Sequence, residues 1–150
     1  MTKTMSKSVT PERLVVDEKS EYVDRLVDAA REARAAAYCP YSNFPVGAAV
    51  LTADGTVYRG CNVENASYGL TICAERNAIA AAIAAGHVDF LAIAISTQAS
   101  AIARPCGACR QVIAEFSQVE HPVLVISESG SGELVMEAIS KLLPATFTLL

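Results

Sequence analysis

Apolar residues recur along the chain at spacings that alternate between helical and extended. Between Glu18 and Tyr38 they return every three or four positions and charged residues fill the other face, which predicts an amphipathic helix. The apolar runs 46–51 and 57–62 flank Asp54-Gly55, a pair that favours the positive φ of a hairpin turn. We therefore expect these two runs to be antiparallel strands.

The second half of the chain continues the alternation. An alanine-rich segment, 74–85, ends at Gly86, a residue typical of the left-handed stop of a helix. After it we expect a strand at 90–96, a helix at 109–116, a strand at 123–126 and a helix at 133–143, ended by Pro144. Alternating strands and helices predict a layered α/β fold.

The chain has the size and composition of one globular domain. It has 150 residues, of which 52% are hydrophobic, enough for one substantial core. Residues 1–17 are polar and lack clear periodicity, so we expect them to be a mobile N-terminal extension. Residues 18–150 are predicted to form the domain itself.

Charge and hydropathy exclude several classes of function. The net charge of −4, with scattered lysines and arginines, argues against a nucleic-acid partner. Aromatic residues are 6% of the chain and tryptophan is absent, which disfavours binding of single strands by base stacking. No segment approaches the roughly 20 apolar residues that span a bilayer, and none resembles a secretory signal, so we expect a cytoplasmic protein that binds no membrane.

Three of the five cysteines have the spacing of metal ligands. Cys106 and Cys109 are separated by two residues, of which Gly107 permits a tight turn, and Cys73 lies upstream. The other two, Cys39 and Cys61, are interpreted as buried thiols. Structural zinc sites usually have four protein ligands, whereas catalytic sites have three and leave a position open. The three thiols therefore predict an open, catalytic zinc site.

The residues beside the predicted ligands fit that chemistry. Zinc lowers the pKa of a water that it binds from about 15.7 to about 7, and Glu75 is placed to handle the water's proton as general acid and base. Three thiolates overcompensate the charge of the zinc ion. Arg76 and the helix N-termini expected at the cysteines can offset the excess negative charge.

These motifs resemble those of known deaminases. Cysteine ligands, a glutamate that is not a ligand and Pro-Cys-x-x-Cys match the zinc nucleobase deaminases. Segments 41–49, 62–68 and 142–144 resemble the small homotetrameric cytidine deaminases, and the likeness spans about 18–147. The resemblance implies a three-layer α/β/α fold with a mixed sheet of about five strands and one Zn²⁺ per subunit.

The resemblance also implies a substrate and its binding residues. The expected reaction is hydrolysis of free cytidine and 2′-deoxycytidine to uridine and 2′-deoxyuridine with release of ammonia, a step of pyrimidine salvage. Asn62 and Glu64 would hold the ribose 3′-hydroxyl, and the carboxylate would repel a nucleotide's phosphate. The remaining implied contacts are Phe44 and Ala74 in the subunit's own site and Ala66, Tyr68 and Phe147 in a neighbouring subunit's site.

Four other functions fit part of the pattern. A structural zinc module would need Cys39, Cys61 or a histidine as a fourth ligand. A redox protein would use the Cys-x-x-Cys pair but would not explain Cys73 or Glu75. A deaminase of RNA or single-stranded DNA would need a basic, aromatic groove. A blasticidin S type deaminase shares the zinc motifs, and the Asn62/Glu64 pair with Phe147 favours cytidine over it.

Overall fold

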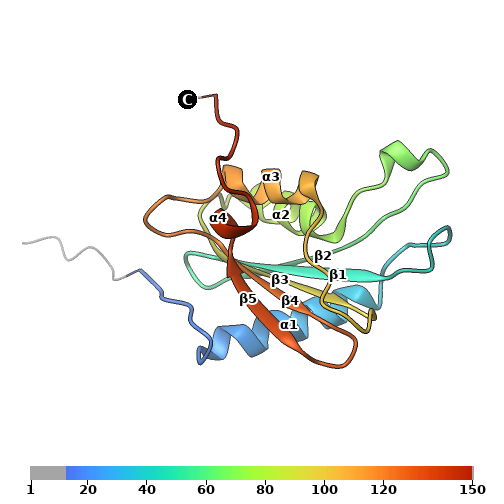
Figure 1. The fold of residues 1–150 in the computed structure, drawn as a ribbon, viewed down its shortest axis with the longest axis horizontal. Coiled ribbons are helices and arrows are strands. Elements are labelled where there is room, and N and C mark those ends of the chain that lie inside the picture. Colours follow the sequence, from blue (N-terminus) through green and yellow to red (C-terminus); the bar gives the residue numbers. More distant parts are fainter. Residues whose placement is uncertain (1–12, 150) are drawn as a thin grey trace, which may run out of the picture.

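The computed structural model describes residues 13–149. One mixed sheet lies at its centre, with strands in the order β2-β1-β3-β4-β5 (Figure 1). β1 pairs antiparallel with β2 and β3, β3 runs parallel to β4, and β4 pairs antiparallel with β5. The strands are β1 (Val46–Thr52), β2 (Val57–Cys61), β3 (Phe90–Thr97), β4 (Leu124–Glu128) and β5 (Leu134–Ala138).

Helices cover both faces of the sheet, as expected for three layers (Figure 1). On one face α1 (Glu21–Arg34) packs through Leu26 and Ala30 against alternate residues of the central strands. On the other face α2 (Ala74–Ala84), α3 (Gly107–Glu115) and α4 (Ile139–Leu142) pack against the intervening strand residues. Successive side chains of a strand point to opposite faces of the sheet. Each central strand therefore contributes residues to both apolar cores.

Most of the expected elements are present. Gly55 turns the hairpin between β1 and β2 with a φ of 84°, and Gly86 follows α2 with a φ of 95°. α1 is shorter than expected, because Ser20 accepts a hydrogen bond from the Tyr22 amide as N-cap and the chain leaves the helix after Arg34. α3 begins two residues earlier than expected, at Gly107.

The helix predicted at 133–143 is wrong. Residues Leu134–Ala138 form the edge strand β5, and only Ile139–Leu142 is helical. A tight turn at 129–133, with Gly132 at a φ of 86°, places the segment beside β4, where it completes the antiparallel ladder. The backbone pairing overrides the helix propensity of leucine, methionine, glutamate and alanine.

The described part of the N-terminal extension contacts the domain. Arg13 makes a two-pronged salt bridge with Asp89, with nitrogen–oxygen distances of 2.8 and 2.9 Å. Val16 is buried in the core beneath α1. Residues 1–12, the remainder of the predicted mobile extension, lie outside the described residues.

Two connections extend beyond one end of the sheet, and they bear on the site. They join α1 to β1 and β2 to α2, and the second contains a short 3₁₀ helix, η1 (Tyr68–Leu70) (Figure 1). Tyr38 and Val63 form an isolated β-bridge between the two connections. The rings of Tyr41 and Tyr68 pack edge to face, with their centroids 5.8 Å apart. The two connections therefore form one continuous surface.

Candidate zinc and nucleoside site

Three cysteine side chains converge at the N-termini of two helices. Cys73 is the N-cap of α2, Cys106 is the N-cap of α3, and Cys109 lies in the first turn of α3. Their sulfur atoms all lie within 4.8 Å of one another, and those of Cys73 and Cys106 are 3.9 Å apart. Tetrahedral Zn–S bonds of about 2.3 Å separate two sulfur ligands by roughly 3.8 Å, so this spacing fits a zinc ion.

The chemistry of the thiols also fits a metal ion. A hydrogen bond with Cys109, assisted by Arg76, lowers the pKa of Cys73 to about 5. The same hydrogen bond, burial and the Glu75 carboxylate raise the pKa of Cys109. One thiolate therefore forms readily, and the buried second thiol needs the positive charge of a metal to ionise.

The described residues provide three sulfur ligands and no fourth. Neither Cys39, Cys61 nor a histidine joins the cluster in residues 13–149. Cys39 and Cys61 were expected to be buried, but both are only partly buried, and Cys61 donates to the Ala36 carbonyl at 3.5 Å. The cluster therefore has the composition of an open site rather than of a closed structural one.

Glu75 lies against the cysteine cluster but is not part of the group of side chains that could hold a metal ion. Its side chain is buried in the first turn of α2, and Oε2 lies 3.0 Å from Cys109 Sγ. Burial raises the pKa of Glu75, partly opposed by the hydrogen bond from Cys109. A carboxyl group whose pKa is raised above its ordinary value holds a proton more readily, which suits a group that must both accept and return one.

Arg76 supplies positive charge on the same helix turn. Its Nη2 donates to Cys73 Sγ at 3.5 Å, and the contact with this thiol raises the pKa of the guanidinium further. Nε of Arg76 is buried without a hydrogen-bond partner among the described residues. An uncompensated cationic donor at this place fits an anionic metal–thiolate cluster.

A cavity of about 430 Å³ opens beside the cluster. It brings together Phe44, Asn62, Glu64, Ala74 and Glu75, which were predicted to serve one site. The other lining residues are Ser42, Val46, Thr71, Cys73, Ile95, Thr97, Ala103, Arg104 and Cys106. Buried Ala74 places the N-terminus of α2 in the wall, and Phe44 is 40% exposed.

Asn62 and Glu64 hold the connection that precedes β1. Asn62 accepts from the Val46 amide through Oδ1 at 2.9 Å and donates from Nδ2 to the Phe44 carbonyl at 2.9 Å. Glu64 accepts from the amides of Tyr41 and Ser42. Both polar side chains thus fix the position of Phe44 as well as lining the cavity.

Three of the predicted substrate contacts lie outside this cavity. Tyr68 is 75% exposed and lines an adjoining hollow of about 290 Å³ with Tyr41 and Ser42. Ala66 is exposed on the same connection. Phe147 is 69% exposed on the C-terminal tail, whose backbone carbonyl at that residue accepts from Gln111 at 3.1 Å. Their predicted role in a neighbouring subunit stays a prediction.

Several lining residues carried no signal in the sequence analysis. Thr97 ends β3, and Arg104 precedes the Pro105-Cys106 ligand segment and pairs with Glu137 at 2.6 Å. Ser42 is part of the segment that suggested the resemblance, and its polar character two residues before Phe44 was the available clue. None of these roles follows from spacing, because each depends on contacts between distant elements.

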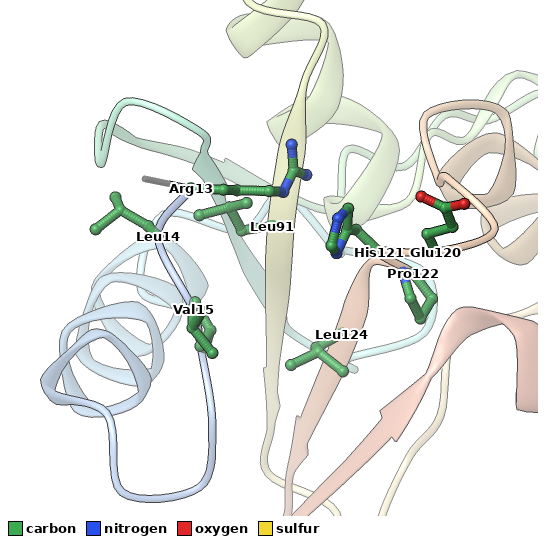
Figure 2. A pocket seen from close by; sticks show the side chains of 9 residues that line it. Arg13, Leu14, Val15, Leu91, Glu120, His121, Pro122 and Leu124 are labelled. Atoms are coloured by element: carbon green, nitrogen blue, oxygen red, sulfur yellow. The ribbon is translucent and has the colours of Figure 1, made fainter. Parts of the chain in front are cut away.

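A second cavity, of about 420 Å³, lies elsewhere on the molecule (Figure 2). It lies between the N-terminal segment and the starts of β3 and β4, and its labelled side chains include Leu91, Leu124 and His121. None of the predicted site residues lines it. Because the two cavities are similar in size, volume does not show which one is the functional site. The cysteine cluster identifies the cavity beside it as the candidate.

Comparisons with known proteins agree with the site. Residues 20–125 match the family model for the cytidine and deoxycytidylate deaminase zinc-binding region. A cytidine deaminase of Sporosarcina psychrophila is 46% identical over 84% of this chain and 91% of its own length. The crystal structure of the cytidine deaminase from Burkholderia pseudomallei, 46% identical, matches with a TM-score of 0.76 over 83% of this chain and 98% of the other.

A blasticidin S deaminase is more distant. This protein, from Bacillus cereus, is 29% identical over 69% of this chain and 76% of its own length. The matched segment of the zinc-binding model includes all three cysteines, Glu75 and the Asn62/Glu64 pair. The chain belongs to the cytidine and deoxycytidylate deaminase family of zinc enzymes.

Proposed function

We propose that the protein hydrolyses free cytidine and 2′-deoxycytidine to uridine and 2′-deoxyuridine, releasing ammonia. The observation that carries this proposal is the shared cavity: Cys73 and Cys106 of the cysteine cluster line it together with Glu75, and Asn62, Glu64 and Phe44 line it as well. A cavity of this size suits one nucleoside. The similarity to cytidine deaminases supports the same substrate class.

Cys73, Cys106 and Cys109 would hold the zinc ion. When bound, zinc lowers the pKa of water and so makes a nucleophile available at neutral pH. Glu75 takes a proton from the attacking water and gives a proton to N3 of the cytosine ring. Glu75 then takes the remaining proton from the C4 hydroxyl and passes it to the leaving amine, so that the C4–N bond breaks, ammonia departs and the oxygen stays on C4 as a carbonyl.

The sugar end of the cavity would select a nucleoside. Glu64 is a hydrogen-bond acceptor, and hydrogen bonds lower its pKa, so it is a carboxylate at neutral pH. A carboxylate accepts from a ribose hydroxyl and repels a phosphate, a preference that the net charge of −4 reinforces. Phe44, partly exposed in the cavity wall, offers a ring face to the base.

We also propose a homotetramer with shared sites. Exposed apolar side chains concentrate on the two connections beyond the sheet: Tyr38, Tyr41, Val63, Tyr68, Leu70 and Ile72. Another exposed aromatic residue, Phe147, lies on the C-terminal tail. Apolar patches on a monomer's surface are typical of interfaces, and Tyr68 and Phe147 lie outside the cavity of their own subunit.

No helix within residues 13–149 combines the length and apolar character needed to cross a bilayer. We propose a cytoplasmic location, where free nucleosides are available and thiol ligands stay reduced. A role in pyrimidine salvage follows from the reaction, because it converts a cytosine nucleoside into a uracil nucleoside.

The direct test is the ultraviolet absorbance of cytidine mixed with zinc-loaded protein. We expect a steady loss of cytidine absorbance, with equimolar ammonia, that a chelator abolishes and added zinc restores. Blasticidin S, assayed in parallel, should be turned over far more slowly. No loss of cytidine absorbance from zinc-loaded protein, or faster turnover of blasticidin S, would contradict the proposal.

Shared sites can be tested by complementation. Glu75→Gln and Phe147→Ala each damage a different component of a shared site, so each variant alone should be weakly active. If a neighbour supplies Phe147, subunits mixed and reassembled from the two variants contain sites with both residues intact, and activity should rise. A mixture no more active than the sum of the separate variants would argue against sharing, and a monomer in light scattering would exclude it.

A further inference from the structure

One serine hydroxyl connects the two residues predicted to hold the sugar and the base. Ser42 Oγ lies 2.5 Å from Oε2 of Glu64 and 3.1 Å from the amide nitrogen of Phe44. The Phe44 amide can only donate, so the hydroxyl accepts from it. The single proton of Ser42 is therefore directed at the Glu64 carboxylate.

The backbone around Ser42 supports this arrangement. Asn43, between the serine and Phe44, has a φ of 55°, in the left-handed region that asparagine tolerates better than most residues. Its amide donates to the Cys39 carbonyl at 3.0 Å. The turn at Asn43 allows the Ser42 hydroxyl to contact the amide two residues ahead and the carboxylate on the other connection.

The contacts of Glu64 leave it little free acceptor capacity. Oε1 accepts from the amides of Tyr41 and Ser42, at 2.9 and 3.1 Å, and Oε2 accepts from the Ser42 hydroxyl. A carboxylate has about four lone-pair sites, two on each oxygen. Three are occupied, and the site left is on Oε2, the oxygen that Ser42 holds.

We propose that Ser42 is a positioning residue that fixes Glu64 so that its carboxylate accepts from a single sugar hydroxyl. This inference rests on the proposed function, because it names how the same cavity selects its substrate. A carboxylate limited to one hydroxyl must use one common to ribose and 2′-deoxyribose if both nucleosides are substrates. The 3′-hydroxyl is the ring hydroxyl that both sugars carry.

The test compares cytidine with 3′-deoxycytidine. Wild-type protein should prefer cytidine by about 10- to 100-fold in kcat/KM, the effect of one hydrogen bond to a charged group. Ser42→Ala removes the hydrogen bond that holds Oε2, the oxygen left to accept from the sugar, so the preference should fall by about tenfold, mainly through a higher KM for cytidine. Ser42→Thr keeps the hydroxyl and should restore the preference.

Two controls separate positioning from folding. Ser140→Ala removes an exposed serine of α4 away from the cavity and should leave both substrates unaffected. Dissociation constants for the two nucleosides, measured by calorimetry in a Glu75→Gln background, give the same preference without turnover. In this background too, Ser42→Ala should weaken cytidine binding and leave 3′-deoxycytidine binding unchanged.

The outcomes distinguish this inference from the proposed function. If wild-type protein does not deaminate cytidine, the proposed function fails. If it does, but Ser42→Ala keeps the wild-type preference or loses both nucleosides equally, Ser42 does not position Glu64 for the sugar. A reduced preference that threonine restores supports the inference.

Discussion

Oε2 of Glu75 and Sγ of Cys109 lie 3.0 Å apart, both buried, where the N-termini of α2 and α3 meet. The carboxylate is therefore fixed beside the predicted metal ion by two helices rather than by a loop. Rigid placement of this kind lets one group carry out successive proton transfers at one substrate.

Replacing Glu75 by glutamine keeps the shape of the side chain and removes its ability to carry protons. A positioned acid/base contributes about 10²- to 10⁴-fold, so Glu75→Gln should lose at least that much in kcat. Zinc content, measured by atomic emission after dialysis, should stay near that of wild type because the three thiols remain. Glu115→Gln, on the exposed face of α3, is the matched control. Loss of zinc from Glu75→Gln would show that the carboxylate is a ligand.

Arg76 is expected to tune the metal site through Cys73. Its Nη2 is 3.5 Å from Cys73 Sγ, and losing such a contact typically lowers metal affinity about 10- to 100-fold. Arg76→Gln should therefore release zinc more readily in a chelator competition. The attacking water should also become less acidic, so the acidic limb of the kcat profile should shift to higher pH.

The control for Arg76 is Arg59→Gln, which removes an exposed arginine paired with Glu32 at 2.6 Å. Arg76→Lys keeps the charge but loses the planar fork, so an intermediate zinc affinity is expected. An Arg76→Gln variant with wild-type zinc affinity and an unmoved acidic limb would remove Arg76 from this role.

The cysteine cluster was predictable because metal ligands have strict spacing. The Cys-x-x-Cys spacing of Cys106 and Cys109, with Gly107 between them, is recognisable in the sequence. The helix that starts after Cys73 determines the direction of the Glu75 side chain. The contacts of Ser42 were not predictable in the same way. Its partner Glu64 is 22 residues away, and only the pairing of two connections brings them together.

The fold shows the same division. Local signals, such as Gly55 in the hairpin and Gly86 after α2, correctly predicted where elements turn or end. The strand Leu134–Ala138 was predicted as helix because its residues favour helix, and what makes it a strand is the free edge of β4. Tertiary pairing of this kind is invisible to a pattern read along one segment.

The affinity for cytidine should respond to pH through Glu64. The Ser42 hydroxyl, with the amides of Ser42 and Tyr41, lowers the pKa of this carboxyl below its ordinary value of 4.5. The carboxylate form therefore persists as pH falls toward 4.5, and KM should rise only below that region. In Ser42→Ala the pKa moves back up, so KM should begin to rise at a higher pH.

Titration of cytosine itself affects wild type and Ser42→Ala equally, so the difference between their KM profiles reports on Glu64. The profiles are measured over the range in which both proteins stay folded and retain zinc. Superimposable profiles would mean that the carboxylate does not sense the serine hydroxyl.

Gly60 of β2 is expected to be irreplaceable because α2 lies directly over it. A Cβ at this position would lie 2.3 Å from the Ala78 amide nitrogen and 2.6 Å from the Ala74 carbonyl oxygen. Both are backbone atoms, so the helix and strand must separate. Gly60→Ala should lower the free energy of unfolding by roughly 1–3 kcal/mol, measured by urea titration.

Because α2 begins at the ligand Cys73, the same displacement should reduce kcat as well as stability. Gly69→Ala is the matched control for stability, since a Cβ there meets no atom within 4 Å in the same subunit. Gly60→Ala and Gly69→Ala proteins of equal stability would mean that the contact between β2 and α2 relaxes without cost. A Gly60→Ala protein that is less stable but fully active would mean that the geometry of the cysteine cluster does not depend on the close packing of α2 against β2.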